Sequence, residues 1–115
     1  MRSLFIASIL LIGFAATMPQ ADAADVRMFI RHEVTDYTTW RKAYDAFDAT
    51  RQKLGVTGQA VYQSLDNTND VTVTHDFQTA DKAKAFASSP DLKTTMEKAG
   101  VKGNPQIWFT TSAAK

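Results

Sequence analysis

The sequence has no cysteine, only two histidines, and little proline or glycine. The lack of cysteine excludes disulfide bonds, zinc sites built on thiolates and a lipid anchor attached to cysteine. Two histidines are one short of the three protein ligands that a catalytic zinc site usually has. Serine hydrolase, dinucleotide-binding and phosphate-loop signatures (G-x-S-x-G, G-x-G-x-x-G and G-x-x-x-x-G-K) are also absent. Any chemistry must therefore come from a small set of residue types.

Charge is balanced and spread along the chain. The net charge is +1, and lysines alternate with acids without a basic stripe or a long block of one sign. Proteins that bind nucleic acids or anionic membrane surfaces usually show such a basic patch. We therefore expect no nucleic-acid partner, and no membrane partner once the first residues have been removed.

The first 23 residues have the pattern of a secretory signal peptide. A short basic start precedes the apolar run Leu4–Ala16, and the small-x-small site Ala21-Asp22-Ala23 follows. The run is too short for a helix to cross a bilayer core of ~30 Å, which disfavours the alternative of a retained N-terminal anchor. We predict cleavage after Ala23, and a periplasmic or secreted mature chain of residues 24–115.

The mature chain is long enough for one domain and too short for two. Domains of this size bury only about 60–65% of their unfolded surface, and this one has no disulfide to add stability. A partner subunit that covers part of the surface would compensate. Homodimerisation is therefore expected from size alone.

Hydrophobic periodicity predicts four strands. Two of them alternate strictly between apolar and polar residues, and each places a histidine, His32 or His75, among the apolar positions. The polar stretch Asp66–Asp70 separates the middle two strands as a turn. The segments expected as strands are Val26–Val34, Thr57–Leu65, Val71–Phe77 and Gln106–Thr111.

Two helical regions are expected between these strands. The first begins after the N-cap Asp36 and ends at Gly55, since large apolar residues recur at helical spacing: Tyr37, Trp40, Tyr44, Phe47 and Leu54. The second begins after Thr79, breaks and restarts at Ser89-Pro90, and ends at Gly100. Its core-facing residues would be Ala83, Phe86, Ala87, Leu92, Met96 and Ala99.

The order βαββαβ is that of a ferredoxin-like α+β fold, with a four-stranded antiparallel sheet and both helices on one face. The other face would carry Phe29, Val61 and Trp108 among polar residues. That is too much apolar surface to leave to water, so a face-to-face dimer is expected. Arg27 and Arg31 lie on the same face and are expected to serve the dimer.

Four segments resemble the dimeric α+β barrel superfamily, and within it the antibiotic-biosynthesis-monooxygenase-like proteins, some of which are called cyclases. They are "RHEVTDYTTWRKAYD", "NDVTVTHDF", "AKAFASSPDLKTTMEKAGV" and "PQIWF", and the resemblance covers nearly all of Val26–Phe109. It implies a homodimer and a pocket between the sheet and the helices. It does not determine the reaction, because the superfamily includes cofactor-free oxygenases, haem-degrading enzymes, isomerases, polyketide cyclases and proteins without known activity.

The two histidines are candidates for one site. The first and third strands are neighbours in this fold, and one register that aligns their apolar faces places His32 opposite Val73 and His75 opposite Ile30. The imidazoles would then be diagonal neighbours, with backbones ~7–8 Å apart. A shift of two residues would move them out of reach of each other.

The predicted pocket is aromatic with a few polar groups, as ligand pockets usually are. Histidine transfers protons near neutral pH, and a tyrosine hydroxyl can orient a phenolic or enolic oxygen. We predict a small-molecule enzyme without a cofactor that acts on an aromatic or enolic substrate. The predicted catalytic residues are His32, His75, Tyr37 and Tyr44, and the predicted substrate-binding walls are Trp40, Phe77 and Phe86.

Two other classes of function remain open. The protein could be a binding module for a planar ligand, haem or a metal, with the histidines as a copper or haem-iron contact. Alternatively, the aromatic residues only build the core that any small domain needs, and the protein serves assembly. The leading prediction is a protein without a physiological metal. If the protein does bind a metal, both histidines are required as ligands.

Overall fold

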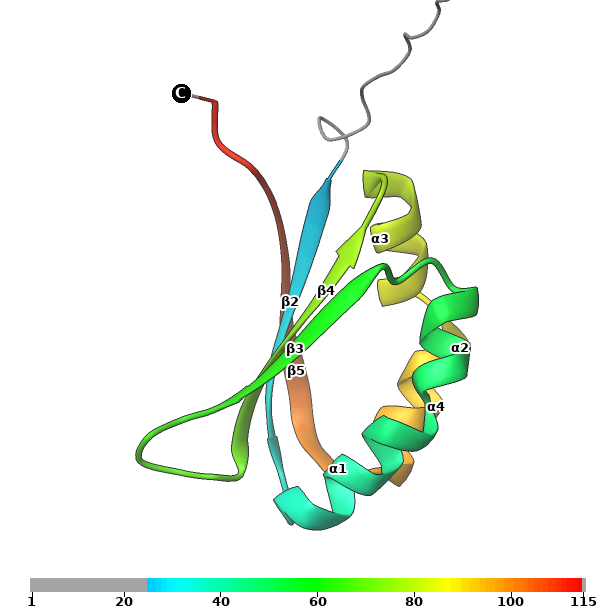
Figure 1. Ribbon diagram of the computed structural model, residues 1–115. Coiled ribbons are helices and arrows are strands. Elements are labelled where there is room, and N and C mark those ends of the chain that lie inside the picture. Colours follow the sequence, from blue (N-terminus) through cyan, green and yellow to red (C-terminus); the bar gives the residue numbers. More distant parts are fainter. Residues whose placement is uncertain (1–24, 115) are drawn as a thin grey trace, which may run out of the picture.

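The computed structural model describes residues 25–114, so the predicted signal peptide lies outside the described residues. Four strands form one antiparallel sheet in the order β3-β4-β2-β5, and the helices cover one of its faces (Figure 1). The elements are β2 (Val26–Val34), α1 (Tyr37–Ala46), α2 (Asp48–Lys53), β3 (Gly58–Gln63), β4 (Asp70–Phe77), α3 (Ala80–Ala87), α4 (Pro90–Lys98) and β5 (Val101–Thr111). The predicted ferredoxin-like α+β fold is confirmed.

The helices begin where the sequence predicts. The Asp36 carboxylate accepts a hydrogen bond from the Thr39 amide at 2.9 Å, and the Thr79 hydroxyl accepts one from the Lys82 amide at 3.2 Å. Ser89 caps α4, with Pro90 as its first residue. Among residues 25–114, no helix has the length and apolar character needed to span a bilayer.

The first helical region is two helices and not one. The backbone leaves helical geometry at Phe47 (φ −85°, ψ 0°), between α1 and α2. The core-facing stripe nevertheless continues across the break, because Phe47 and Leu54 still pack against the core. Thr57–Leu65 is likewise shorter as a strand than predicted, since β3 covers only Gly58–Gln63.

The last strand is longer than predicted and contains a bulge. β5 begins directly after Gly100, and the β2–β5 pairing shifts between Arg31, opposite Gln106, and Glu33, opposite Lys102. Only His32 lies between those two positions on β2, whereas residues 103–105 lie between them on β5. A bulge tolerates Pro105, which has no amide to give to a ladder. Gly103 and Pro105 therefore lie in a bulge inside β5, and the strand continues on both sides of them.

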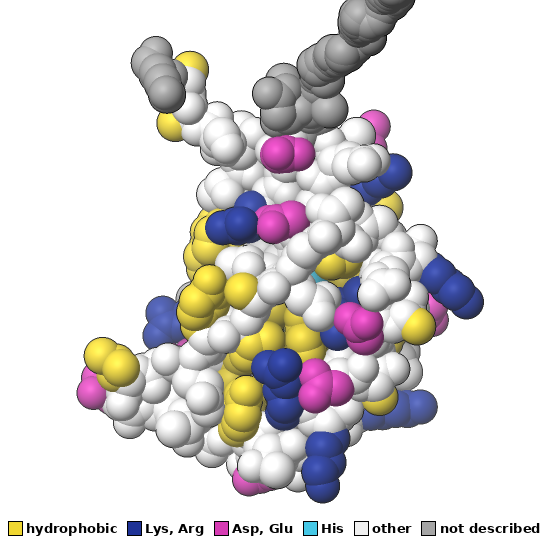
Figure 2. Space-filling model, viewed as in Figure 1, with side chains coloured by type: hydrophobic (Ala, Val, Ile, Leu, Met, Phe, Trp, Pro, Cys, Tyr) yellow, Lys and Arg dark blue, Asp and Glu magenta, His cyan; other side chains and the backbone are white. Residues whose placement is uncertain are grey.

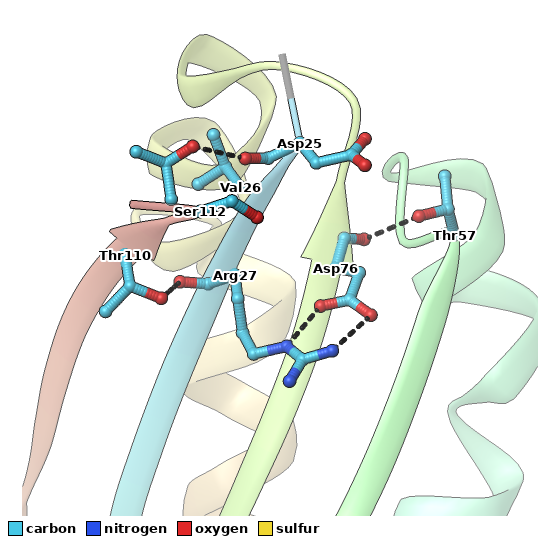
Figure 3. A pocket seen from close by; sticks show the side chains of 8 residues that line it. Asp25, Val26, Arg27, Thr57, Asp76, Thr110 and Ser112 are labelled. Atoms are coloured by element: carbon cyan, nitrogen blue, oxygen red, sulfur yellow. Dashed lines mark hydrogen bonds and ion pairs between the residues drawn. The ribbon is translucent and has the colours of Figure 1, made fainter. Parts of the chain in front are cut away.

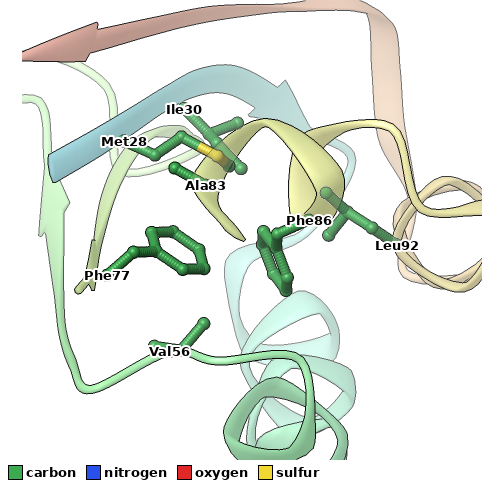
Figure 4. Close-up of a cluster of buried hydrophobic side chains, with 7 residues drawn as sticks. All are labelled: Met28, Ile30, Val56, Phe77, Ala83, Phe86 and Leu92. Atoms are coloured by element: carbon green, nitrogen blue, oxygen red, sulfur yellow. The ribbon is translucent and has the colours of Figure 1, made fainter. Parts of the chain in front are cut away.

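The buried side chains form two adjoining clusters between the sheet and the helices. One is shown in Figure 4 and consists of Met28, Ile30, Val56, Phe77, Ala83, Phe86 and Leu92. The other consists of Val34, Trp40, Tyr44, Val71, Val73 and Ala99. Six of the predicted core-facing residues thus belong to these clusters: Trp40, Tyr44, Ala83, Phe86, Leu92 and Ala99.

The prediction for the open sheet face is partly wrong. Phe29 and Trp108 lie there as expected and stack with ring centroids 5.1 Å apart. Val61 instead pairs with Val73 and packs against the second core cluster. The neighbouring Tyr62, opposite Thr72, is the β3 aromatic on the open face. Adjacent residues of a strand point to opposite faces, so a one-residue error in phase exchanges the two.

Candidate functional site

Tyr44 and His75 form a buried polar pair between the sheet and the helices. The Tyr44 hydroxyl, on α1, and His75 Nε2, on β4, lie 3.3 Å apart and are joined by a hydrogen bond. His75 is 2% exposed, and its Nδ1 has no hydrogen-bond partner among the described residues. The pair lies where the two core clusters meet, since the His75 ring also packs on Phe86 at 5.1 Å.

A row of rings extends from this pair in both directions. Trp40 stacks on Tyr44 at 4.9 Å, and His32 and Tyr37 contact Trp40 at 5.7 and 5.8 Å between ring centroids. At the other end, Phe86 packs on Phe77 at 5.4 Å. All seven residues that the sequence proposed for the site therefore belong to one contiguous aromatic row. Contact between rings is what packing alone also produces, so the row does not by itself define a pocket.

The two histidines do not form one site, because the strands pair in the other of the two registers considered, which moves the histidines out of reach of each other. His32 pairs with Val71, and His75 pairs with Met28, which is a shift of two residues from the predicted alignment. Met28 precedes His32 by four residues, so the histidines lie about 13 Å apart along the strand direction. Both registers bury the same apolar face, which is why alternation alone did not distinguish them.

This separation also excludes a metal site that uses both histidines as ligands. A metal bound to two imidazoles needs both nitrogens within about 2.1 Å of the ion, which the strand geometry does not allow. Residues 25–114 contain no group of three His, Asp or Glu side chains that could hold an ion. Glu33 follows His32 on β2, and Asp76 follows His75 on β4. Both carboxylates point to the open face of the sheet, as predicted.

Arg51 is the residue of this region that sequence reasoning missed. It is 1% exposed on α2, and its guanidinium carbon lies 3.7 Å from the centre of the Tyr44 ring. It donates hydrogen bonds to the Tyr44 carbonyl, to Gln59 Oε1 and to Asp48 Oδ1. The signal was present, because position 51 lies seven residues after Tyr44 and four after Phe47, on the core-facing stripe. A charged residue at a core position of an amphipathic helix is itself a reason to look for function.

Burial sets the ionisation of the pair. Desolvation, and after it the charge of Arg51, lower the pKa of His75 to about 4. Burial raises the pKa of the Tyr44 hydroxyl, while Arg51 and Arg41 oppose that shift. Burial also lowers the pKa of His32. At neutral pH the pair therefore consists of a neutral imidazole and a neutral phenol.

The part of the chain that the structure describes has two pockets away from the Tyr44–His75 pair. One, of about 370 Å³, is bordered by the Arg27–Asp76 ion pair and by hydroxyl groups of Thr57 and Thr110 (Figure 3). The other, of about 520 Å³, lies beside the β5 bulge and has His32 in its lining. Neither is lined by Tyr44 or His75, whose surroundings are filled by the aromatic row. In Figure 2 a small histidine surface is visible between the sheet edge and the helices, beside hydrophobic side chains.

Neither a family model nor a curated protein sequence matches this chain. Its fold is similar to several solved structures. The cofactor-independent oxygenase SnoaB of Streptomyces nogalater has a TM-score of 0.66 at 12% identity, over 81% of this chain and 97% of that one. A monooxygenase of Streptomyces coelicolor in complex with the ligand nanaomycin D has a TM-score of 0.59 at 16% identity, over 84% and 93%.

A conserved protein from Methanosarcina mazei is similar to the same degree, with a TM-score of 0.66 at 13% identity over 81% of this chain and 97% of that one. At such identities the likeness shows a common fold. The resemblance to antibiotic-biosynthesis-monooxygenase-like proteins is thereby confirmed at the level of the fold.

Proposed function

We propose that this chain is a monooxygenase-like enzyme that needs no cofactor and acts on an aromatic or enolic substrate at the Tyr44–His75 pair. The observation that carries the proposal is the 3.3 Å hydrogen bond between the two side chains inside an aromatic layer. An apolar environment with a few convergent polar groups is what a small-molecule site requires. The likeness in fold to a cofactor-independent oxygenase supports the same class of reaction.

In this reaction the substrate hydroxyl displaces the Tyr44 hydroxyl from His75 Nε2 and transfers its proton to that nitrogen, while the Tyr44 hydroxyl donates a hydrogen bond to the substrate oxygen that becomes negative. For a naphthol, the overall change is naphthol plus O₂ to naphthoquinone plus water. The substrate supplies the electrons; one oxygen atom enters the product and the other leaves as water. Trp40, Phe77 and Phe86 form the walls, and His32 and Tyr37 lie at the outer end of the row.

A second candidate is a protein whose aromatic residues only pack, or which holds a planar ligand without converting it. It is favoured by the closeness of the packing, because Trp40, Phe77 and Phe86 are all core members that are almost fully buried. A substrate would have to displace some of these contacts. Removal of the Tyr44 hydroxyl distinguishes the candidates, since it changes the pair's chemistry and leaves the ring in place.

The first experiment is a binding titration of the mature protein with nanaomycin D, followed by tryptophan fluorescence. Tyr44→Phe is expected to weaken binding by roughly tenfold, which corresponds to the loss of one hydrogen bond of about 1.4 kcal/mol. Tyr62→Phe, the same change on the open face, is expected to bind like the wild type. Equal binding by both variants, or none by the wild type, would count against a ligand site at the pair.

Export is part of the proposal. Residues 1–23 are proposed to be removed as a signal peptide, which leaves a domain of residues 24–115 in the periplasm or the medium. The N-terminal sequence and intact mass of the exported protein test this directly, and a mature chain that begins at Ala24 is expected. The same mass measurement, made under native conditions, would show any haem or metal that a single histidine holds.

The proposed assembly is a homodimer formed by the open sheet faces. The face has an apolar centre, with Trp108 stacked on Phe29. Two bidentate ion pairs border it, Arg27 with Asp76 and Arg31 with Asp70, each with a contact of 2.7 Å. Pairing within the chain neutralises those charges, so they can approach a second copy at little electrostatic cost. An apolar centre with a polar border is the usual anatomy of an interface.

A further inference from the structure

We propose that Arg51 is a positioning residue, which holds the Tyr44 hydroxyl against His75 by linking helix α2 to the strand beside His75. The inference rests on the proposed function only in so far as the pair is catalytic. The contacts themselves are independent of any substrate.

The guanidinium of Arg51 lies against the ring of Tyr44. Its carbon lies 3.7 Å from the ring centre, whereas that of Arg41, the other arginine near this ring, lies 5.6 Å away. Arg51 also donates a hydrogen bond from Nη1 to the Tyr44 backbone carbonyl. It therefore contacts both the ring and the main chain of the residue whose hydroxyl must meet His75.

Arg51 also connects helix α2 to the sheet. Arg51 Nε donates to Gln59 Oε1 at 2.9 Å, and Gln59 is the direct partner of His75 in the β3–β4 ladder. The contacts thus close a ring: Tyr44 to His75, His75 to Gln59 across the strands, Gln59 to Arg51, and Arg51 back to Tyr44. Asp48 joins both Arg51 and Gln59, at 3.2 and 3.1 Å.

The charge of Arg51 is hydrogen-bonded although the side chain is buried. A buried guanidinium is costly unless its donors are satisfied, and all three nitrogens of Arg51 have an acceptor here. An apolar side chain at this core position would avoid that cost, so packing alone does not explain an arginine. The planar fork satisfies three acceptors in fixed directions, which an ammonium group does not do.

The charged and titratable groups that act on the pair come from several elements. They are Arg41, Asp45, Asp48 and Arg51 on the helices, and Asp76 on the strand of His75. Arg51 is the cation that influences both members, because it lowers the pKa of His75 and of Tyr44. Loss of its charge is therefore expected to raise the pKa of His75.

The test is ¹⁵N NMR of the His75 imidazole in the full mature protein, without ligand. Arg51→Lys keeps the charge and removes the fork, so the Nε2 resonance is expected to lose the shift of its hydrogen bond to Tyr44 while the pKa of His75 stays low. Arg51→Met is expected to lose the hydrogen-bond shift and also to raise that pKa. Arg41→Lys, the matched change near the same ring, is expected to leave both unchanged.

A second pair of variants tests the same proposal if substitution of the buried Arg51 prevents folding. Gln59→Leu removes the sheet anchor of Arg51 at an exposed position, and Gln63→Leu makes the same change on the same face of β3. Only Gln59→Leu is expected to alter the His75 resonances. Wild-type His75 spectra in Arg51→Lys or in Gln59→Leu would overturn the proposal, whatever the outcome of ligand binding.

Discussion

At the scale of single residues, Tyr44 and His75 depend on each other for a hydrogen bond. His75 Nδ1 has no partner among the described residues, so Nε2 carries the only hydrogen bond of a buried ring. A buried polar group without a partner costs about 1–3 kcal/mol. The unpartnered Nδ1 is the kind of local cost that a protein tolerates when a group has a use besides packing.

Tyr44→Phe tests the energetic side of this pair. The change removes the hydroxyl and leaves the buried Nε2 of His75 without a partner, so the free energy of unfolding should fall by about 1–3 kcal/mol in urea denaturation. The exposed Tyr62→Phe should change it by less than about 0.5 kcal/mol. Equal effects of the two substitutions would mean that the hydrogen bond does not stabilise the fold.

His75 also makes stability depend on pH. Its pKa is about 4 in the folded chain and ordinarily 6.5, so the unfolded chain binds more protons between these values. The contribution of the neutral His75 to the free energy of unfolding is therefore fully present above pH 6.5. It declines by about 3 kcal/mol as the pH falls to 4, at about 1.4 kcal/mol per pH unit. The buried His32, whose pKa is also lowered, adds to the decline in the same direction.

His75→Gln is expected to remove most of that decline. Urea unfolding at a series of pH values measures it, with His32→Gln as the matched variant. Hydrogen bonds from Arg31 lower the pKa of the Asp70 carboxyl, and hydrogen bonds from Thr39 lower that of the Asp36 carboxyl, so their contributions to stability are lost mainly at lower pH. An unchanged slope between pH 6.5 and 4 in His75→Gln would show that the imidazole is accessible to water.

The sequence predicted the individual residues of the aromatic row but not their partners. Tyr37, Trp40 and Tyr44 share a helical face by spacing alone, and the histidines lie on apolar strand faces by alternation. Which histidine meets Tyr44 depends on strand register, and registers two residues apart bury the same side chains. Arg51 was not among the predicted residues, although its position belongs to the core-facing stripe.

At the scale of elements, the junction from α4 to β5 is fixed by Gly100. Its φ is +90°, and an added Cβ would lie 2.6 Å from the Thr35 hydroxyl oxygen. The Gly100 carbonyl also accepts the Thr35 amide at 3.0 Å, which joins the start of β5 to the end of β2. Gly103, in the bulge, also has a positive φ of +64°, but an added Cβ there meets nothing within 4 Å.

These two glycines provide a matched pair of substitutions. Gly103→Ala should cost about 1–2 kcal/mol, because only the left-handed backbone is unfavourable for alanine. Gly100→Ala should cost clearly more, since the backbone cost and the clash with Thr35 add. Urea unfolding of both variants measures the difference, and equal losses would mean that Thr35 moves aside without cost.

Element boundaries were predictable where a side chain caps the helix and not where the backbone bends inside a segment. Asp36, Thr79 and Ser89 bind the first amides of their helices, so their chemistry is visible in the sequence. The break at Phe47 has no such mark, because the apolar spacing continues through it. The predicted last strand began only at Gln106, whereas β5 begins at Val101 and accommodates Gly103 and Pro105 in its bulge.

At the scale of the whole molecule, the helices cover one face of the sheet and leave the other open (Figure 1). Trp108 is 42% exposed and Tyr62 56% exposed on that face. Aromatic residues are enriched at interfaces and are the side chains on which binding energy usually depends. A second copy placed on this face would bury them.

Trp108→Lys should therefore convert the proposed dimer into a monomer. A charge at the apolar centre would be buried without a partner, which costs several kcal/mol in an interface. Native mass spectrometry or sedimentation measures the oligomeric state. Leu65→Lys, at a fully exposed apolar residue outside the strands, is the control and should remain dimeric. A monomeric wild type, or a dimeric Trp108→Lys variant, would contradict a dimer formed by the open sheet faces.

Turnover of a naphthol under ¹⁸O₂ by the mature wild type, with mass spectrometry of the product, tests whether the Tyr44–His75 pair performs proton transfer for an oxygenation. We expect one ¹⁸O atom in the quinone, and a rate at least about 100-fold lower in His75→Gln and Tyr44→Phe but not in Tyr62→Phe. Turnover no faster than without protein, or equal rates in all variants, would contradict this role of the pair.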